Sequence, residues 1–586
     1  MKRSQRIGAL VVATSLGLVA AACGSDNSGS SSTTAAPATT GAATTAGGGT
    51  ATTTATTGGS AAPSGNLLKY DESAKCGTDA YKGNIAKLEA VDASTVKFTL
   101  CTPDVAVPSK VAFSALQIAP SEYLEKAGGT KGGDLVNKPI GTGPYVLKQW
   151  DRGSQIVLEA NPNYWGDKPK SKTVVFQWNG ESAQRLVQLQ SGAADGMDNV
   201  GTTDFDTVKN DGNLQLVERP ALNVFYVGFN VDNPPFDNEK VRQAIGYAID
   251  KQRIVDNFYP KGSTVATQFL PAAIPGYTKG FTDFTYDQAK ARQLLQESGV
   301  ALPLNVTLSY RDVARGYLAQ PAPVAQDIQA QLAAVGINLT LDQQESTTFI
   351  DNANSGKLPF YMLGWGADFP DATNFYDYHF GAGGTPQFGK GFSDIQALIT
   401  QGGQKSNQAE RDAIYAQVAQ LLAQHVPMVP VANGGSATAY KKGVENPQAS
   451  PLTAEVMAKM GSAGQDQFVF VQNGEPGGLY CADESDGEAL RVCKQIGESL
   501  LSYKINGTEV EPSLAEKYES SADLKEWTFH LRNGVKFSDG STLDANDVVK
   551  SYRVQWDAAD PLHQGREGNF TYFSALFGGF LNPPPS

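Results

Sequence analysis

Hydrophobic and polar residues alternate over several short stretches of the chain, a pattern typical of half-buried β-strands. In STVKFTL, the side chains of Val96, Phe98 and Leu100 fall on one face and polar side chains fall on the other. The stretches 304–309 and 337–341 alternate in the same way. The sequence therefore predicts strands at places that are far apart along the chain.

Other segments place hydrophobic residues three and four positions apart, which predicts amphipathic helices. These segments are 237–250, 287–299, 324–332 and 410–425. Asp237 or Asn238 precedes the first helix and Asp287 precedes the second, where a side-chain oxygen caps the free N–H groups. Gly299 and Gly336 lie where a helix commonly ends in a left-handed residue. Because helix, glycine and strand follow one another twice, we predict an α/β fold.

The stretch EWTFHLRNGVKF predicts a β-hairpin near the end of the chain. Residues 527–531 alternate as a strand should. Asn533-Gly534 suits the two positive φ angles of a type I′ turn, and residues 535–537 would supply the return strand.

The first 23 residues predict export and a lipid anchor. Lys2, Arg3 and Arg6 precede an apolar run, and three alanines precede Cys23. This is the layout of a secretory signal, and a cysteine directly after small residues is typical of a bacterial lipoprotein anchored to the cell membrane through that cysteine. The alternative is a plain secretory signal with an incidental cysteine. Residues 24–65 are almost entirely Gly, Ser, Thr, Ala and Pro, which predicts a disordered tether.

Composition limits the partners and the chemistry that the chain suits. With 586 residues, of which 41% are hydrophobic, it is long enough for two lobes or more. Its formal net charge is -13 and no basic run occurs beyond the first six residues, so nucleic acid is not an expected partner. Neither GxSxG nor HExxH occurs and the four histidines are scattered, so we expect no catalytic constellation, metal site or cofactor.

The remaining cysteines predict disulfides. They are Cys76, Cys101, Cys481 and Cys493. An even number in an exported protein favours disulfides, and four cysteines allow three pairings. Proximity along the chain favours Cys76 with Cys101 and Cys481 with Cys493. A metal site is the competing interpretation, but the cysteines lack CxxC spacing.

Four blocks of sequence together resemble the extracytoplasmic solute-binding proteins of ABC transporters, in particular the peptide/nickel-binding family 5 that includes dipeptide- and oligopeptide-binding proteins. The blocks are LAEKYESSADLKEWTFHLRNGVKFSDGSTLDANDVVKSY (514–552), NKPIGTGPYVLKQW with NPNYWGDKP (137–169), VGFNVDNPPFDNEKVRQAIGYAIDKQRIV (227–255) and LGWGADFPDATNF (363–375). The resemblance covers essentially everything after residue 65. It implies a two-lobed α/β clamp of the type II periplasmic-binding-protein class, which closes on its ligand by a hinge motion.

The blocks come in an order that differs from the family's. There, the block that resembles 514–552 lies early in the mature domain and precedes the block that resembles 137–150. Moving residues 461–586 in front of residue 66 restores the family order, so a circular permutation is the simplest interpretation. A tandem array cut across two copies and a gene-model artefact are the alternatives.

The resemblance and the changed order together predict the domain organisation, with lobe I assembled from three pieces. The predicted segments are 1–23 (signal peptide), 24–65 (tether), 66–224 (lobe I), 225–432 (lobe II), 433–460 (return to lobe I) and 461–586 (lobe I, the family's N-terminal part). A permutation also predicts that Ser586 lies near Gly65 on the surface. It predicts further that FVFV (468–471) packs in the same lobe as GTGPY (141–145).

The family's ligand site is carried over to the block that contains GWGADFPD. In peptide-binding members, an Asp after the Trp of this block pairs with the ligand α-ammonium, and Asp368 is the matching residue, with Trp365 as a wall of the pocket. A buried ammonium needs a carboxylate to offset its desolvation. The alternative for Asp368, and the more favoured role for Asp371, is to cap a helix or turn a loop.

The resemblance also points to residues for the rest of the ligand. A ligand carboxylate would meet Arg315, or Arg311, in SYRDVARGYLAQ, and a surface role is the alternative for both. The loop QNGEPGGLY (472–480) is expected to line the cleft from lobe I, which makes Asn473 and Tyr480 candidates. Tyr480 lies beside a cysteine, so packing around a disulfide is its alternative role.

The function that the resemblance implies is solute capture. The protein would bind peptides or similar small solutes as a monomer and present them to an ABC permease and its ATPase, with no bond broken. Nickel-chelate, opine or oligosaccharide binding by the same fold is an alternative. A secreted hydrolase that uses Asp368 and a second carboxylate is an alternative of another class.

Overall fold

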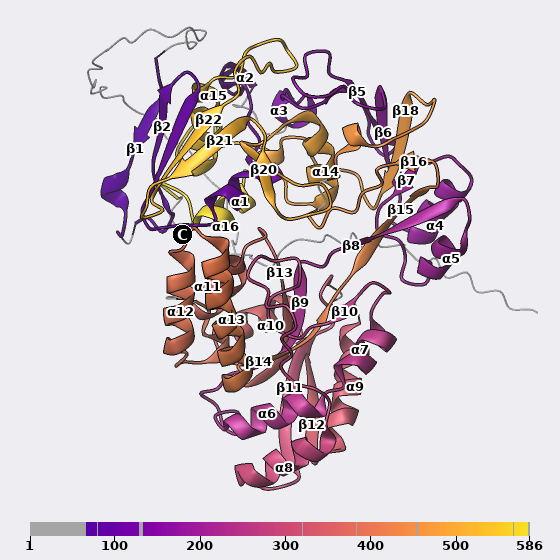
Figure 1. The fold of residues 1–586 in the computed structure, drawn as a ribbon, viewed down its shortest axis with the longest axis vertical. Coiled ribbons are helices and arrows are strands. Elements are labelled where there is room, and N and C mark those ends of the chain that lie inside the picture. The colour runs from indigo at the N-terminus through magenta and orange to yellow at the C-terminus, as the bar shows by residue number, and fades with distance from the viewer. Residues whose placement is uncertain are drawn as a thin grey trace, which may run out of the picture.

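A computed structural model describes residues 66–583 except residues 79, 128–132, 314, 319, 382–383, 453–454 and 567. Within these residues the chain forms two bodies (Figure 1). We call the body with the five- and seven-stranded sheets lobe I and the body with the six-stranded sheet lobe II. This is the two-lobed α/β architecture that the sequence predicts. The predicted signal peptide, Cys23 and the tether lie outside the described residues.

The first sheet of lobe I is antiparallel and has the order β1-β2-β3-β22-β21. Its strands are β1 (Lys69–Asp71), β2 (Ile85–Asp92), β3 (Thr95–Leu100), β21 (Ala515–Ser520) and β22 (Glu526–Leu531). Strand β22 lies beside β3, with Trp527 opposite Phe98, and Figure 1 shows these yellow strands next to the indigo ones. Helix α15 (Ala545–Trp556) packs against β2 and β3. The sheet therefore combines strands from both ends of the described chain.

The second sheet of lobe I has the order β4-β5-β6-β18-β7-β15-β8. Its strands are β4 (Tyr145–Asp151), β5 (Gln155–Ala160), β6 (Thr173–Trp178), β7 (Gly196–Met197), β8 (Leu214–Arg219), β15 (Ser436–Lys441) and β18 (Gln467–Gln472). Strand β18 carries FVFV and runs parallel to β6 and β7. Since GTGPY leads into β4 of the same sheet, the prediction that FVFV and GTGPY share a lobe is confirmed.

The glycines of GTGPY serve a close contact between chain segments. The N–H of Gly143 donates to the carbonyl of Ile496, at the end of α14 (Gly487–Ile496), at 2.8 Å. A Cβ on Gly141 would lie 2.3 Å from the same carbonyl oxygen. The absence of a side chain thus permits this approach, as a structural turn requires.

Smaller elements of lobe I surround these sheets. They are α1 (Val107–Val111), α2 (Ser121–Ala127), α3 (Asp134–Asn137), α4 (Ser182–Gln190), α5 (Phe205–Asn210), α16 (Thr571–Phe577), the 3₁₀ helices η1 (Ser73–Lys75), η2 (Ser114–Leu116), η4 (Met457–Lys459) and η5 (Cys481–Asp483), and the strand pairs β16 (Val444–Glu445) with β17 (Gly461–Ser462) and β19 (Leu501–Tyr503) with β20 (Val510–Pro512).

Lobe II has one mixed sheet in the order β10-β14-β9-β13-β11-β12. Its strands are β9 (Asn223–Phe229), β10 (Thr264–Val265), β11 (Leu304–Arg311), β12 (Ile337–Gln344), β13 (Phe360–Gly366) and β14 (Met428–Asn433). Its helices are α6 (Glu239–Ala248), α7 (Lys251–Phe258), α8 (Gln288–Ser298), α9 (Pro321–Ala333), α10 (Ser346–Asn354), α11 (Ala372–Phe380), α12 (Ser393–Gly403), α13 (Gln408–His425) and η3 (Pro386–Phe388).

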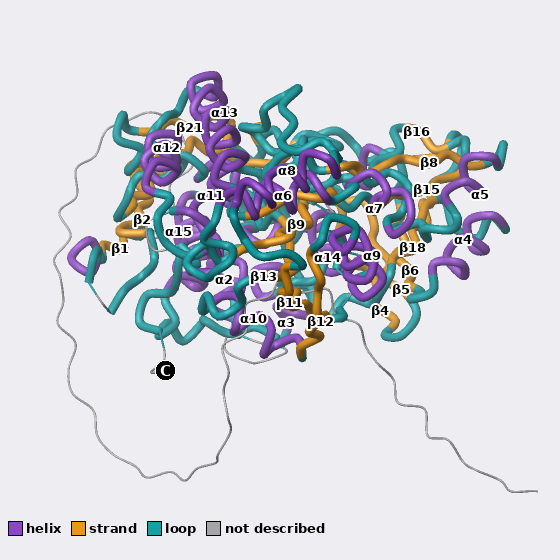
Figure 2. Tube along the Cα trace, turned by 90° about the horizontal axis from the view of Figure 1, so that it is seen from below, coloured by secondary structure: helices purple, strands orange, loops and turns teal. Residues whose placement is uncertain are grey.

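Helices cover both faces of the lobe II sheet, and alternate residues of β9 show how. Phe225, Val227 and Phe229 belong to the buried cluster that contains α6 to α9. Val224 and Tyr226 point the other way, into the cluster that contains α10 to α13. Figure 2 shows α11 to α13 and the pair α7 and α9 on opposite sides of the strands. The sheet is thus buried on both faces, as expected for α/β architecture.

The chain crosses between the lobes twice. Residues 220–222 link β8 to β9, and Gly434-Gly435 link β14 to β15. The Asn223 side chain ties the crossings together, since its Nδ2 donates to the Gly434 carbonyl at 2.9 Å and its Oδ1 accepts from the Gly434 N–H at 2.8 Å. The two crossings therefore lie side by side.

The predicted helix ends are confirmed in detail. Asn238, rather than Asp237, caps α6 by accepting from the Lys240 N–H at 3.0 Å. Asp287 caps α8, and Gly299 ends α8 with a φ of 75°. These contacts form between near neighbours in the sequence, which is why local pattern predicts them.

The predicted hairpin over 527–537 is wrong. Within the Asn533-Gly534 pair only Gly534 has a positive φ, of 75°, so the turn is not type I′. Residues 535–537 form no strand and contribute one isolated bridge, from Lys536 to Thr542. Both edges of β22 are occupied by β3 and β21, which leaves no edge for a return strand.

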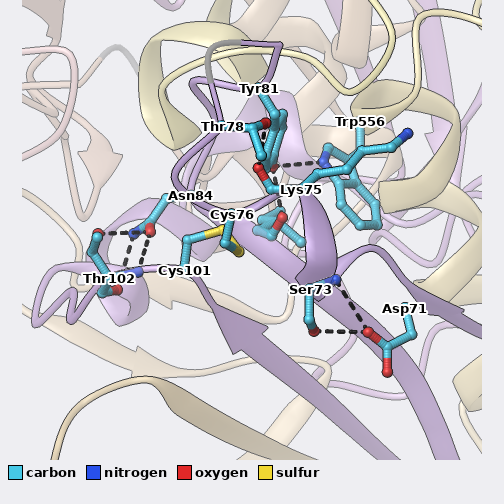
Figure 3. Close-up of a disulfide and its surroundings, with 11 residues drawn as sticks. Asp71, Ser73, Lys75, Cys76, Thr78, Tyr81, Asn84, Cys101, Thr102 and Trp556 are labelled. Carbon is cyan, nitrogen blue, oxygen red and sulfur yellow. Dashed lines mark hydrogen bonds between the residues drawn. A yellow bond between two sulfur atoms is a disulfide. The ribbon is translucent and has the colours of Figure 1, made fainter.

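Both favoured disulfides are present. Cys76–Cys101 and Cys481–Cys493 have Cα–Cα distances of 5.3 and 5.9 Å. The first joins the loop after β1 to the residue after β3, as Figure 3 shows. In the same view Trp556 Nε1 donates to the Tyr81 hydroxyl at 2.8 Å. The C-terminal segment therefore packs against the region that this disulfide holds.

Further contacts join the two ends of the described chain within lobe I. The Leu68 N–H donates to Asn546 Oδ1 at 2.9 Å, and Lys75 Nζ donates to Asn582 Oδ1 at 2.9 Å. Asn66 and Asn582 are both exposed on the surface of this lobe. Ser586 and Gly65 lie outside the described residues, so their proximity stays a prediction.

Candidate ligand-binding cleft

A cavity of about 900 Å³ lies where the two lobes meet. Its lobe II wall comes from the start of β9, the end of β13 and α11, and its lobe I wall comes from α16 and the residues beside it. Residues 220–222 and Gly434 of the two crossings line it as well. The shape of the cavity therefore depends on how the lobes are placed relative to each other.

Asp368 and Trp365 lie together on the lobe II wall. Asn374 of α11 holds both, because its Oδ1 accepts from Trp365 Nε1 and from the Asp368 N–H, each at 3.1 Å. Its Nδ2 donates to the Asp368 carboxylate, also at 3.1 Å. Helix α11 begins after Asp371, which caps it. One side chain in the first turn of α11 thus fixes the loop between β13 and α11.

Aromatic rings form the wall beside Asp368. Trp365 stacks on Tyr378 with ring centroids 4.5 Å apart and planes 20° apart. His379 meets Trp365 edge-on at 5.0 Å, and its Nδ1 donates to the Phe375 carbonyl at 2.6 Å. Burial lowers the pKa of His379 to about 3, so the ring is neutral at physiological pH. The wall therefore contributes packing surface and no positive charge.

Asp368 is a half-buried carboxylate without an ion pair among the residues that the structure describes. Burial raises its pKa above the usual range, and the hydrogen bond from Asn374 opposes the rise. Its charge adds to burial in raising the pKa of Tyr378 and of Tyr572. Because Tyr572 belongs to lobe I, the carboxylate acts across the cleft. A cation that entered here would find an unneutralised partner.

Asp371 has the structural role that the sequence favoured for it. Its carboxylate accepts from Arg411 Nη2 at 2.6 Å and from Nη1 at 2.9 Å, and it also caps α11. Although burial opposes ionisation, the guanidinium holds the pKa of Asp371 below its usual range. Asp371 is thus neutralised inside lobe II.

The two candidate arginines are placed differently. Arg315 lines the cavity, on a short loop where its N–H donates to the Leu318 carbonyl at 3.0 Å. Arg311 is 5% exposed and donates to Ser346 Oγ and to the Tyr317 hydroxyl, each at 2.9 Å. Arg315 is therefore the one that a ligand in this cavity would meet.

Tyr480 and Asn473 lie outside the lining of this cavity. Tyr480 is buried beside the Cys481–Cys493 disulfide and meets Phe570 edge-on at 6.1 Å. Asn473 accepts from Arg185 Nη1 at 3.2 Å. Both positions serve packing within lobe I.

The lobe I wall comes instead from residues that carry no recognisable motif. They include Asn569, Thr571, Ser574 and Phe580. The Asp483 carboxylate holds this segment by accepting the N–H groups of Gly568, Asn569 and Phe570 at 2.7, 2.8 and 3.0 Å. The sequence predicted that the 472–480 loop forms this wall. No residue of that loop lines the cavity, and Asp483, which follows the loop, holds the wall by accepting hydrogen bonds from backbone N–H groups.

The described part of the chain contains neither a candidate metal site nor a candidate membrane-spanning helix. Among those residues no cluster of three or more His, Cys, Asp or Glu side chains has the arrangement to hold a metal ion. No helix within 66–583, outside the undescribed gaps, has the length and apolarity that crossing a bilayer needs.

Comparison with known proteins agrees with the fold and the cleft. The chain belongs to the bacterial extracellular solute-binding proteins, family 5, because the model of that family (family 5 Middle) matches residues 46–387 and 509–568. It is similar to di/tripeptide-binding protein 1 of Pseudomonas aeruginosa (strain UCBPP-PA14), with 32% identity over 378 residues that cover 63% of this chain and 70% of that protein.

Two further relatives support the same family. The dipeptide-binding protein of Escherichia coli (strain K12) is 30% identical over 376 residues, which cover 63% of this chain and 70% of that protein. The solved structure of HbpA2 from Haemophilus parasuis matches with a TM-score of 0.59 at 29% identity and covers 62% of this chain and 72% of that chain. The family and the two-lobed fold implied by the four sequence blocks are thereby confirmed.

Proposed function

We propose that the protein is the solute-binding receptor of an ABC importer and that it binds peptides or similar small solutes in the cavity between its lobes. The observation that carries this proposal is Asp368, an unpaired carboxylate beside Trp365 on the cavity wall. A peptide α-ammonium supplies the missing charge, and its hydrogen bonds offset its desolvation. The names of two relatives, a dipeptide- and a di/tripeptide-binding protein, support this ligand class.

The rest of the cavity suits a short ligand with two charged ends. Its volume of about 900 Å³ falls in the range of about 300–1,000 Å³ usual for small-molecule sites. We assign Arg315 to the ligand carboxylate and the rings of Trp365 and Tyr378 to its side chains. If the protein recognises the charged ends of the ligand and packs apolar walls around the rest, it can bind peptides with many different side chains.

Capture follows from the two crossings. We assign residues 66–219, 436–460 and 461–586 to lobe I and residues 223–433 to lobe II, because β9 begins at Asn223 and β14 ends at Asn433. Rotation at 220–222 and at Gly434-Gly435 would bring the lobes together around a ligand and exclude water from it. The closed receptor, acting as a monomer, then presents its ligand to the permease and ATPase, and the ligand leaves unchanged.

The test is to identify what the purified protein holds. Native mass spectrometry should show a retained mass of di- or tripeptide size, and added dipeptides should raise the melting temperature without being cleaved. Hydrolysis of the peptide would overturn the receptor in favour of the hydrolase. If a nickel chelate, an opine or an oligosaccharide stabilises the protein and no peptide does, the protein is still a solute-binding receptor but its ligand is not a peptide.

We propose further that Cys23 is lipidated, which would hold the receptor at the outer face of the cell membrane, outside the cytoplasm. The support is the sequence pattern, since Cys23 lies outside the described residues. Cys23→Ser should release the protein from membranes into the soluble fraction. Equal membrane retention of the variant would contradict the anchor.

We also propose that the chain is a circular permutation of the family order. Three observations support it. The family model matches two separate stretches, and relatives align with 63% of this chain. In the sheets of lobe I, β18 lies between β6 and β7, and β22 lies beside β3, all three of which come from much earlier in the sequence. A gene that places residues 461–586 in front of residue 66 should give a protein with the same ligand affinity. An unfolded product would contradict the permutation.

A further inference from the structure

Phe369 follows Asp368 in lobe II yet packs in the core of lobe I. Its side chain is 6% exposed and belongs to the large buried cluster of lobe I. Among the described residues between 223 and 433, no other buried residue belongs to that cluster. Lys110 Nζ of α1, in lobe I, lies 4.9 Å from the centroid of the Phe369 ring. The burial of this ring therefore depends on the approach of the two lobes.

Lys110 is held where it receives the ring. Its Nζ lies 2.7 Å from the Asp104 carboxylate, and the two side chains are 12% and 10% exposed. The same Nζ lies 5.8 Å from the ring centroid of Phe577 in α16. The ammonium thus contacts one aromatic ring from each lobe, and such cation–π contacts strengthen as water is excluded. Helix α16 also lines the ligand cavity, so this contact borders the cleft.

The backbone on both sides of Phe369 is fixed to the ligand wall. Asn374 holds Asp368 through its N–H and its carboxylate. The Asp371 N–H donates to the Phe369 carbonyl at 2.9 Å, and Asp371 is held by Arg411. Asp368 cannot move toward lobe I without carrying Phe369 with it.

We propose that Phe369 is the positioning residue that couples ligand capture at Asp368 to closure of the lobes. A ligand bridging the cleft draws the Asp368 loop toward lobe I, and the Phe369 ring then docks beside Lys110. In the open form the ring is exposed, so its burial and its contact with Lys110 stabilise the closed form. This inference rests on the proposed function, because it assumes that a ligand binds at Asp368.

The test compares variants of the full chain. Phe369→Ala removes the ring, Phe369→Leu keeps apolar volume, and Lys110→Met keeps the stem and removes the charge. Phe392→Ala is the matched control, because Phe392 is a half-buried aromatic residue of lobe II that packs on that lobe's own cluster. Thermal unfolding of each variant establishes that it folds.

The readout is the distance between the lobes. Val91 in lobe I and Tyr286 in lobe II are 47% and 44% exposed, so each can be replaced by an unnatural residue that bears a ketone, to which a spin label is attached. Pulsed electron paramagnetic resonance then measures the distance between the two labels. We expect Phe369→Ala to populate longer distances and to bind Ala-Phe dipeptide about tenfold or more weakly, as loss of a buried phenyl ring from the closed state alone implies. Phe369→Leu and Lys110→Met should lie between this variant and wild type, and Phe392→Ala should match wild type.

The outcomes separate this inference from the proposed function. If wild type binds no dipeptide, the proposal that the ligand is a peptide is wrong. The distances between the labels without ligand still show whether Phe369→Ala separates the lobes. Identical distance distributions in wild type and Phe369→Ala, with and without dipeptide, overturn the coupling role. If Phe369→Ala also binds the dipeptide with wild-type affinity, the coupling role fails and the proposal of peptide capture stands.

Discussion

Arg491 Nη2 lies 2.7 Å from Asp198 Oδ2, although 293 residues separate the two in the sequence. They belong to a square of four charges, in which Arg491 Nε bonds Glu455 Oε2 at 2.8 Å and Arg219 Nη2 bonds Asp198 Oδ1 and Glu455 Oε1 at 2.6 and 2.9 Å. Each of the four side chains is at most 7% exposed. Arg219 ends β8, so the square fixes lobe I directly before the crossing at 220–222.

Breaking this square should destabilise the protein strongly. Although burial opposes ionisation, Arg491 and Arg219 hold the pKa of Asp198 far below its usual range. Arg491→Met leaves the two acids with one cation, so we expect a loss of about 3–5 kcal/mol in the free energy of unfolding. Unfolding in urea measures this loss in the free energy of unfolding. The control is Lys172→Met, which removes a pair with Asp466 whose side chains are 74% and 73% exposed and should change little. Equal effects of the two changes would contradict the account.

The two disulfides should differ in their effect on ligand binding. Replacing both cysteines of either pair by serine should cost about 3 kcal/mol of stability, given loops of 12 and 25 residues. Loss of Cys481–Cys493 should also weaken ligand binding, because Asp483 next to it holds the cavity wall at 568–570. Loss of Cys76–Cys101 should leave affinity unchanged. Calorimetric titration at a temperature where both variants are folded checks this, and equal affinities would remove the role given to Asp483.

The buried ring of His379 makes stability depend on pH. Burial lowers its pKa to about 3, whereas an unfolded histidine has a pKa of about 6.5. Between these values the unfolded chain binds one more proton, so this residue's contribution is full above about pH 6.5 and is lost at about 1.4 kcal/mol per pH unit as the pH falls. Stability curves of wild type and His379→Phe should therefore converge or cross between pH 6.5 and 4.5. Parallel curves would mean that His379 is protonated in the fold.

Local sequence patterns predicted the features of the fold that depend on near neighbours. Asn238, Asp287 and Gly299 act on backbone groups within a turn of themselves, so their type and spacing are sufficient. The hairpin prediction failed because the turn signal of Asn533-Gly534 carries no information about the partners of β22. Those partners include β3, which lies more than four hundred residues earlier and occupies the edge that a return strand would need.

The same limit applies to the cleft. The family resemblance assigns ligand roles to Asp368, Trp365 and Arg315, and the structure brings all three to one cavity. Asn569 and Ser574 of the lobe I wall belong to no motif. Their position depends on hydrogen bonds that backbone N–H groups donate to the Asp483 carboxylate, and such contacts leave no trace in the side-chain pattern.

We propose that Asp368 binds the α-ammonium of the ligand. The most direct test is calorimetric titration of wild type and Asp368→Asn with a free dipeptide and with its N-acetylated form. Asparagine keeps the size of the side chain and the contact with Asn374 but removes the charge. If Asp368 neutralises the ligand ammonium, the substitution should weaken free-dipeptide binding by about a hundredfold or more. The acetylated dipeptide should bind weakly and equally to both proteins. Wild-type affinity of Asp368→Asn for the free dipeptide would contradict the account.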